Sequence, residues 1–236
     1  MLKYISIVFF LLNILPIRAQ EPSTDNTPVR SDDVPSQKEY YWFTPHAAIT
    51  VPNPTGNTAF RKNFAGVYEV SAGMDVMPFK GIFVGAVYKN ATLKITGITG
   101  ATYFHYSPIM KINNAGIRVG GKTFVGSRNR MTGQASVTFG QNWTMFKDIR
   151  CKDSTMAVPV PKYTCTYLEP EIALYFLLEN NFAIGITVSY DIYTKNFNPY
   201  DICLESWKTI GSTGSGPTQY FSFGFGFSYS FYKRKK

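Results

Sequence analysis

The sequence predicts an all-β fold, an eight-stranded antiparallel up-and-down barrel that crosses a membrane, and three observations lead to it. The segment Tyr220–Tyr232 has a large aromatic residue at every odd position from Phe221 to Phe231, with only Ser and Gly between them. Seven other runs alternate in a similar way, and short and long connections alternate between the runs. A period of two is the side-chain period of a β-strand. Bulky apolar residues on one face and small polar residues on the other are typical of a narrow transmembrane barrel.

The composition agrees with a membrane barrel. Only 17% of the residues are charged, 44% are hydrophobic and 16% are aromatic, whereas soluble proteins have roughly 25% charged residues. After the N-terminal residues, no run approaches the ~20 apolar positions of a membrane-spanning helix. Only helices and closed barrels satisfy their backbone groups in lipid, so a membrane form of this chain has to be a barrel.

The N-terminal part is expected to direct secretion and then to lie outside the fold. A positive residue, an apolar stretch and a cleavage site after Ala19 or Gln20 are typical of a secretory signal peptide. The next residues are polar and rich in proline, which favours a disordered periplasmic leader. The predicted parts are a signal peptide over 1–20, a leader over 21–39, the barrel over 40–233 and a basic tail over 234–236.

Eight runs are predicted to be strands, with lengths near those of tilted membrane strands. All but the third alternate cleanly between an apolar and a polar face, and the third is less regular. In chain order the runs are Tyr41–Val51, Asn63–Met77, Ile82–Lys94, Ala115–Val125, Met131–Phe146, Thr166–Leu178, Phe182–Tyr193 and Tyr220–Tyr232. Apolar residues that represent the clean faces are Ile49, Val70, Ile117, Phe139, Leu174, Ile186 and Phe225.

The connections predict which end of the barrel faces outward. The links after the second, fourth and sixth strands are short, and the others are long. Outer-membrane barrels have short periplasmic turns and long outer loops, which places both termini in the periplasm. Two residues do not fit the pattern: Gln141 falls on the predicted lipid face, and Pro170 lies inside the sixth strand. A bulge or the lipid–water interface accommodates either one. The long loops are Pro52–Lys62, Ile95–Asn114, Lys147–Cys165 and Thr194–Gln219.

With these features the chain resembles the small eight-stranded outer-membrane barrels of the OmpX and OmpA transmembrane-domain type. It looks most similar to the PorT-like "porin family" outer-membrane proteins of Bacteroidota. The resemblance covers about Tyr40 to Tyr232 and implies insertion by the barrel-assembly machinery. It departs from the family at the C-terminus, where Phe231-Tyr232 is followed by four basic residues. The same barrel hosts several roles, so the resemblance implies little about activity.

Charged residues on the predicted inner face are expected to form an internal ion-pair network. An eight-stranded barrel is just wide enough to be filled by side chains, and buried charges are tolerated when they are paired. The alternative is a gated polar path or proton relay along the same residues. His46 and Lys89 are further candidates for this face. The predicted network consists of Glu69, Asp75, Arg118, Lys122, Glu169, Glu171 and Asp191.

All three cysteines fall in the predicted outer loops, where secretion permits disulfides. A bond between Cys151 and Cys165 would close a loop of ~15 residues and contribute about 3 kcal/mol. A bond between Cys165 and Cys203 would tie two loops together instead, and the sequence leaves both pairings open. The sequence predicts neither a metal site nor a cofactor, because too few ligands lie near one another.

A non-enzymatic role is predicted, structural, adhesive or secretion-accessory. The alternative is an enzyme at the barrel rim that acts on lipid or peptide, but the only histidines are His46 and His105, and no GxSxG motif is present. The net charge of +9 favours anionic partners, outer-membrane lipid and lipopolysaccharide or an unidentified protein. Nucleic acid is not expected, because no binding motif accompanies the charge. The predicted basic loop contacts are Arg61, Lys62, Lys147, Arg150, Lys152 and Lys162.

Overall fold

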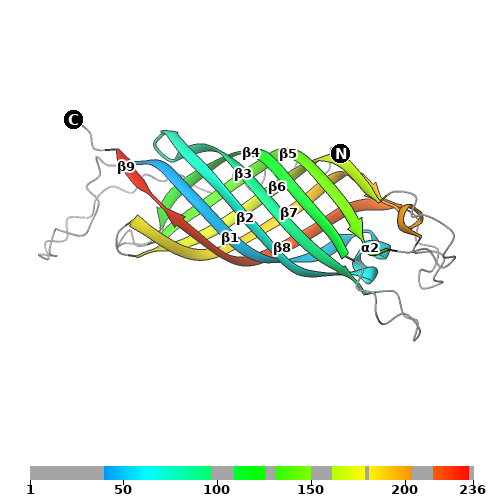
Figure 1. Ribbon diagram of the computed structural model, residues 1–236. Coiled ribbons are helices and arrows are strands. Elements are labelled where there is room, and N and C mark those ends of the chain that lie inside the picture. Colours follow the sequence, from blue (N-terminus) through cyan, green and yellow to red (C-terminus); the bar gives the residue numbers. More distant parts are fainter. Residues whose placement is uncertain are drawn as a thin grey trace, which may run out of the picture. The chain divides into compact units, whose positions relative to one another are not determined.

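The described part of the chain forms one closed antiparallel β-barrel (Figure 1). The computed structural model describes residues 40–96, 109–125, 131–149, 161–178, 181–203 and 215–233. Consecutive strands pair with each other around the wall, and β1 pairs with both β2 and β8, which closes the barrel. This architecture confirms the predicted eight-stranded barrel and, at the level of the fold, the resemblance to the small eight-stranded barrels. The predicted signal peptide, leader and tail lie outside the described residues.

The eight strands occur in the predicted order, and a short ninth segment continues the last one. β8 is interrupted at Ser230, after which β9 continues the pairing with β1. The strands are β1 (Tyr40–Gly56), β2 (Phe64–Phe79), β3 (Ile82–Ile95), β4 (Ile109–Val125), β5 (Met131–Lys147), β6 (Lys162–Leu177), β7 (Phe182–Phe197), β8 (Gly216–Tyr229) and β9 (Phe231–Lys233).

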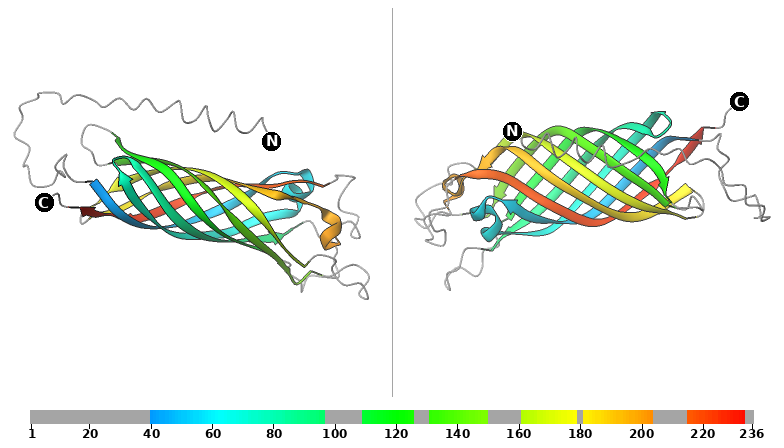
Figure 2. Two further views of the ribbon diagram at one scale, coloured as in Figure 1. Left: turned by 90° about the horizontal axis from the view of Figure 1, so that it is seen from above. Right: turned by 180° about the vertical axis from the view of Figure 1, so that it is seen from behind.

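The closing seam joins the aromatic strand to the first strand, as the sequence predicts. Ala47 lies opposite Phe227, and Thr50 lies opposite Gly224. The first and last strands therefore begin and end beside each other, with Tyr40 opposite Lys233 (Figure 2). We call this end of the barrel the turn end, because the hairpin between β2 and β3 also lies there, and the opposite end the loop end.

The loop end differs from the prediction, because five strands extend farther toward it than expected. β1 runs to Gly56, β4 begins at Ile109, β6 begins at Lys162, β7 runs to Phe197 and β8 begins at Gly216. The four long loops are therefore shorter than predicted. The turn-end bounds, by contrast, agree with the prediction to within two residues except at β8, which ends at Tyr229.

Two short helical segments lie near the loop end. α2 (Thr58–Asn63) connects β1 to β2, and the Asn57 side chain caps it by accepting hydrogen bonds from the backbone of Ala59 and Phe60. The 3₁₀ helix η2 (Pro199–Ile202) follows β7. Among the described residues, neither is long or apolar enough to be a membrane-crossing helix.

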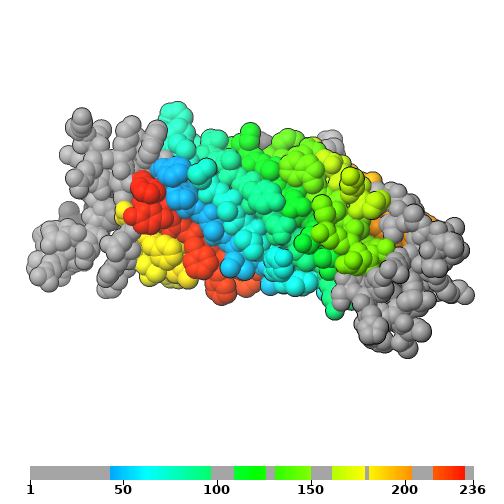
Figure 3. Space-filling model, in the orientation of Figure 1, coloured from blue at the N-terminus to red at the C-terminus, as the bar shows by residue number. Residues whose placement is uncertain are grey.

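The two residues that fit the pattern badly are accommodated without breaking the wall, which is continuous on the face in Figure 3. Pro170 pairs with Val137 of β5, while the register toward β7 passes from Leu168 to Glu171. Proline has no N–H to donate, so this gap is where a strand tolerates it. Gln141 faces outward, opposite Thr166.

Candidate functional site

In the turn-end half of the barrel, the outer face is apolar and the inner face is polar. Ile117 and Phe225 face outward, and their side chains are 65% and 59% exposed. Arg118 and Ser222 face inward and are buried. Water cannot be the solvent of such an outer wall, because contiguous exposed apolar surface of this extent is unfavourable in water.

The outer face changes character along a line around the barrel that crosses every strand but β2, and we call this line the polar ring. On each of these strands the outward apolar residues of the turn-end half are followed by an amide or hydroxyl side chain, beyond which the outward residues are mixed. Neighbours in the ring are linked, with 2.7 Å between Asn90 Nδ2 and Asn113 Oδ1 and 3.1 Å between the hydroxyls of Thr166 and Thr194. On β5 the apolar outward face runs from Met131 to Phe139, close to the ~9–11 residues of a membrane-spanning strand. The ring consists of Asn53, Asn90, Asn113, Gln141, Thr166, Thr194 and Gln219.

On the loop-end side of the polar ring the interior is apolar and forms what we call the apolar plug. Phe60 of α2 is fully buried, and its ring lies 4.9 Å from that of Phe64 and 5.4 Å from that of Phe197. Leu93 and Ile112 contribute buried aliphatic side chains from β3 and β4. The helix α2 thus packs one aromatic side chain into the mouth of the barrel. The plug consists of Ala59, Phe60, Phe64, Leu93, Ile95, Met110, Ile112, Phe146, Phe197 and Ile202.

Lys89 is the centre of a charged cluster in the middle of the barrel. Its Nζ makes an ion pair with Glu169, and lies 3.3 Å from Glu69 Oε1 and 3.4 Å from Asp191 Oδ2. The four residues come from β3, β6, β2 and β7, so the cluster ties walls together across the interior. Thr50 donates to Glu69 over 2.7 Å. Because an unpaired buried charge is costly, one lysine holds three carboxylates in place.

Arg118 is the centre of a second cluster, closer to the turn end. Its Nη2 lies 2.6 Å from Glu171 Oε1, and its Nε donates to Ser136 over 3.2 Å. Its Nη1 lies 3.2 Å from His46 Nε2, which in turn is 3.5 Å from Asp75 Oδ1. The guanidinium also stacks on an aromatic ring of β3.

A layer of amide and phenol groups separates the Lys89 cluster from the apolar plug. Asn114 donates to Tyr193 Oη over 2.8 Å, and its own Oδ1 accepts from Asn142 over 2.7 Å. The hydroxyl of Tyr193 lies 3.0 Å from that of Tyr220 and 3.4 Å from Asp191. From the Lys89 cluster toward the plug, the interior therefore passes from charged to amide to aromatic side chains.

Some strands carry glycine on their inner faces where tyrosine side chains from another strand pack against them. A β-carbon at Gly226 would lie 2.8 Å from the hydroxyl of Tyr175, and one at Gly116 would lie 2.8 Å from that of Tyr167. Real β-carbons essentially never approach so closely, and at Gly116 the backbone oxygen of Phe139 is also only 2.7 Å away. Tyrosines from β6, and not only charged residues, therefore favour a glycine at Gly226 of β8 and at Gly116 of β4.

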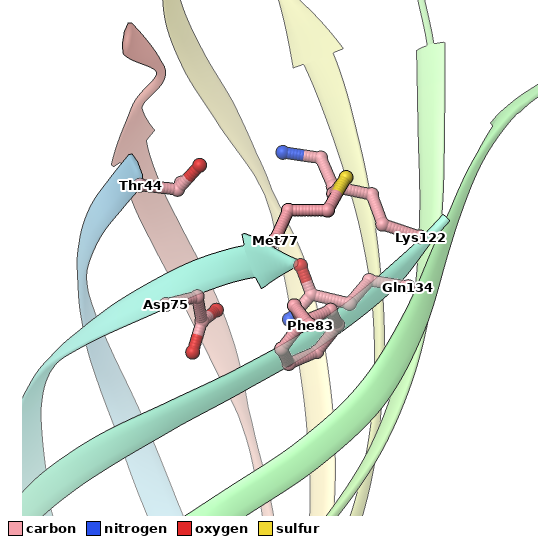
Figure 4. Close-up of a pocket in the computed structure, with 6 residues that line it drawn as sticks. All are labelled: Thr44, Asp75, Met77, Phe83, Lys122 and Gln134. Atoms are coloured by element: carbon pink, nitrogen blue, oxygen red, sulfur yellow. The ribbon is translucent and has the colours of Figure 1, made fainter. Parts of the chain in front are cut away.

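A small pocket opens near the turn end and is lined by Thr44, Asp75, Met77, Phe83, Lys122 and Gln134 (Figure 4). It offers about 10 Å³, close to the room for one water molecule. Lys122 and Asp75 both lie at its wall, from β4 and β2. The pocket is too small for a substrate, so it does not supply an active site.

The structure places all seven residues of the predicted network on the inner face, with six of them in two clusters and Lys122 apart from both. Glu69, Glu169 and Asp191 surround Lys89, and Asp75 and Glu171 lie with Arg118. Lys122 lies at the pocket. Lys89, predicted only as a further candidate for the inner face, is the cation that joins three of the predicted carboxylates. The sequence pattern of β3 did not reveal this role, because its apolar residues face outward before Lys89, as Val84 does, and inward after it, as Leu93 does.

His46 lies inside the wall, in contact with Arg118 and near Asp75. It does not lie at the aqueous rim, and no nucleophile is among its described partners. His105 lies outside the described residues. Among the described residues, no group of three or more His, Cys, Asp or Glu side chains could hold a metal ion.

The predicted pairings of Cys165 are wrong, because Cys165 is a free thiol. It belongs to β6 and not to a loop, and its Sγ lies 3.5 Å from Asn142 Oδ1. The extension of β6 beyond its predicted start turns this thiol into the barrel. Cys151 lies outside the described residues.

The predicted basic contacts fall in three places. Arg61 and Lys62 are exposed on α2, and Lys147 and Lys162 are exposed at the loop ends of β5 and β6. Arg150 and Lys152 lie outside the described residues. Lys147 and Lys162 are therefore fixed by strands, which gives them a defined position relative to the polar ring.

Comparison with known proteins finds similar folds but no similar sequences. No family model and no curated protein matches the chain. Among solved structures, Neisserial surface protein A has 9% identity and a TM-score of 0.49, covering 80% of this chain and 97% of that one. The Ail protein of Yersinia pestis has 10% identity and a TM-score of 0.42, with coverage of 81% and 99%. The N-terminal barrel domain of Pseudomonas aeruginosa OprF has 8% identity and a TM-score of 0.39, with coverage of 81% and 100%.

Proposed function

We propose that this protein is an integral outer-membrane barrel that does not conduct and acts through its loop-end surface, in a structural, adhesive or secretion-accessory role. The observation that carries this proposal is the filled interior. Between the two ends lie the Arg118 cluster, the Lys89 cluster, the amide layer and the apolar plug. A water-filled path needs a continuous polar lumen, and the plug interrupts it with aromatic and aliphatic side chains.

The outer wall supports the membrane location. Its apolar band is bounded by the polar ring and has the height that tilted strands need in a bilayer. The strands continue past the ring, so a rigid extension of the barrel stands out of the membrane on the loop end. By the rule that short turns face the periplasm, both chain termini belong on the periplasmic side, and the extension faces the outside.

Two experiments test this proposal. Purified full-length protein reconstituted in planar bilayers is expected to show no steady conductance, whereas stable single channels would overturn the closed interior. Outer-membrane fractionation together with heat-modifiable gel mobility is expected to recover the folded barrel in the membrane. Recovery as a soluble secreted protein would contradict the location.

The predicted contact with lipopolysaccharide, or with an anionic surface partner, belongs to this extension. Arg61, Lys62, Lys147 and Lys162 give its surface positive charge. Reversing these charges is expected to reduce the lipopolysaccharide that copurifies with the protein. Unchanged copurification would leave a protein partner, identified by crosslinking in native membranes, as the target of this surface.

A further inference from the structure

Resting on the membrane location just proposed, we propose that the outer wall of β3 to β6 above the polar ring binds the phosphorylated headgroup of a lipid in the surrounding leaflet. Four lysines form the site, which we call the lysine patch: Lys94 on β3, Lys111 on β4, Lys147 on β5 and Lys162 on β6. One lysine on each of four neighbouring strands is a regular arrangement. It is visible only through the register, because the four residues are scattered along the sequence.

The register places the four lysines within reach of one another. Lys94 and Lys147 both lie opposite Ile109, on either side of it, and Lys111 and Lys162 both lie opposite Met145. Neighbouring strands are ~4.8 Å apart, so each of these pairs is about 10 Å apart. The diagonal neighbours, such as Lys111 and Lys147, are closer, at about 7–8 Å. Flexible lysine side chains can therefore converge on one or two phosphate groups.

None of the four ammonium groups has an ion-pair partner among the described residues. The exposed Asp148 follows Lys147 in the chain and makes no described ion pair. Elsewhere at this end the pattern differs, since Lys195 lies 3.8 Å from Asp201. Like charges on adjacent cross-strand positions repel. A bound anion removes this repulsion, and phosphate is an anion that ammonium groups bind well.

The wall below the patch suits the rest of a lipid molecule. Next to it lies the Asn90–Asn113 amide pair of the polar ring, with the Tyr88 hydroxyl 2.9 Å from Asn113 Oδ1. Trp143 and Tyr88 are exposed at this level, where aromatic residues mark the membrane interface. Toward the turn end the same strands expose Ile117 and Phe139. Charge, amide, aromatic ring and aliphatic surface thus follow in the order of a phosphorylated headgroup, its polar linkage and its acyl chains.

The opposite wall has no such patch among its described residues. Above the ring, β7 and β8 present Asn196 and Pro217 outward, and β1 presents Thr55. Arg61 and Lys62 lie on α2, beyond the strands. Among the described strands above the ring, outward lysines therefore lie only on β3 to β6, while Lys195 of β7 lies close to Asp201. This position favours a lipid that lies against the wall over a free anion, which could bind equally well around the whole rim.

The test compares lipid retention by the full-length protein and by charge variants. The protein is reconstituted in phosphatidylcholine vesicles that contain diphosphorylated lipid A, and retained lipid is counted by native mass spectrometry. The quadruple variant Lys94→Gln, Lys111→Gln, Lys147→Gln, Lys162→Gln is expected to bind this lipid roughly six-hundredfold more weakly, because each lysine near an anionic surface contributes roughly fivefold. Heat-modifiable gel mobility verifies that each variant is folded.

Three controls make the result specific. The quadruple Lys→Arg variant keeps the charge and is expected to retain the lipid, as is the single variant Lys80→Gln at the exposed β2–β3 turn. Dephosphorylated lipid A is expected to show no preference over phosphatidylcholine. Equal retention by the Lys→Gln variant, equal retention of dephosphorylated lipid, or displacement by inorganic phosphate at concentrations comparable to the lipid would overturn the lipid site. Conductance is recorded separately, so an open channel that still retains the lipid would count against the closed interior alone.

Discussion

Two stretches of the same strand, β4, show opposite arrangements. In the stretch near the turn end, Ile117 faces outward and Arg118 faces inward. In the stretch beyond the polar ring, Ile112 faces inward and Lys111 faces outward. The backbone and its pairing continue unchanged through both stretches. The same strand structure is therefore compatible with either arrangement, and we infer that the medium outside each stretch determines which of its faces is apolar.

The physical reason is the same on both sides of the ring. Apolar side chains leave water wherever they can, because burial of apolar area is favourable. In the proposed membrane location, the outer face of the turn-end half is already away from water, so the interior can hold charges if they are paired. Beyond the polar ring the outer face is in contact with water, so the apolar side chains of the extension are buried in its interior, as in a soluble barrel. The predictions below test this contrast in order of expected effect.

The largest effect is expected inside the membrane section, at Lys89. Lys89→Met leaves Glu69, Glu169 and Asp191 without their cation, which should lower the free energy of unfolding by about 3–5 kcal/mol. Urea unfolding in vesicles, followed by tryptophan fluorescence, measures this change. The control Lys80→Met, at an exposed turn, should change it by less than about 0.5 kcal/mol. Equal effects of the two variants would mean that the cluster does not hold the walls together.

The apolar core of the extension should respond next most strongly. Ile112→Ala removes a buried side chain from the plug, and the lost transfer energy plus the cavity should cost about 2–5 kcal/mol. On the same strand Ile117→Ala faces lipid, which fills the space, so only the transfer energy is lost, about 1–2 kcal/mol. The same unfolding measurement compares them. A larger loss at Ile117 would argue against a packed plug.

A charge placed on the outer wall should separate the two regions. On β6, Ile172→Arg puts an arginine in the apolar band and should cost about 2–4 kcal/mol. Thr164→Arg, above the polar ring on the same face, should change stability by less than about 0.5 kcal/mol. Folding yield into vesicles and urea unfolding report both. If the two substitutions cost the same, the polar ring would not mark the edge of the bilayer.

The smallest effect is expected where the two regions meet. Tyr193→Phe removes the hydroxyl that contacts Asn114, Asp191 and Tyr220, and should cost about 1–2 kcal/mol. The exposed Tyr200→Phe is the matched control and should be near neutral. A neutral Tyr193→Phe would show that water replaces the lost hydroxyl, and the amide layer would then be less dry than its contacts suggest.

The sequence predicted the turn-end half of the barrel well. There the alternation is consistent from strand to strand, because lipid requires an apolar residue at each outward position. The strand order, the closing seam and the inner face of the charged residues all follow from this one requirement. The role of Lys89 was less visible, since β3 changes faces just beyond it.

The loop-end half could not be predicted in the same way. Residues such as Met110, Ile112 and Cys165 face inward there, and a pattern of apolar-outward strands assigns them to loops. The disulfide predicted for Cys165 failed for this reason, because a residue thought to lie in a loop is part of β6.

The amino-acid sequence by itself determined the number of strands, their order, and which face of the membrane section is apolar, because these depend on a local period of two. Only the tertiary structure decided which charged residues meet, since Lys89 and Glu69 come from β3 and β2, whereas Glu169 and Asp191 come from the distant β6 and β7. It also decided where the apolar face changes sides. Individual strands such as β4 cross that boundary, but its course around the wall depends on how neighbouring strands are aligned.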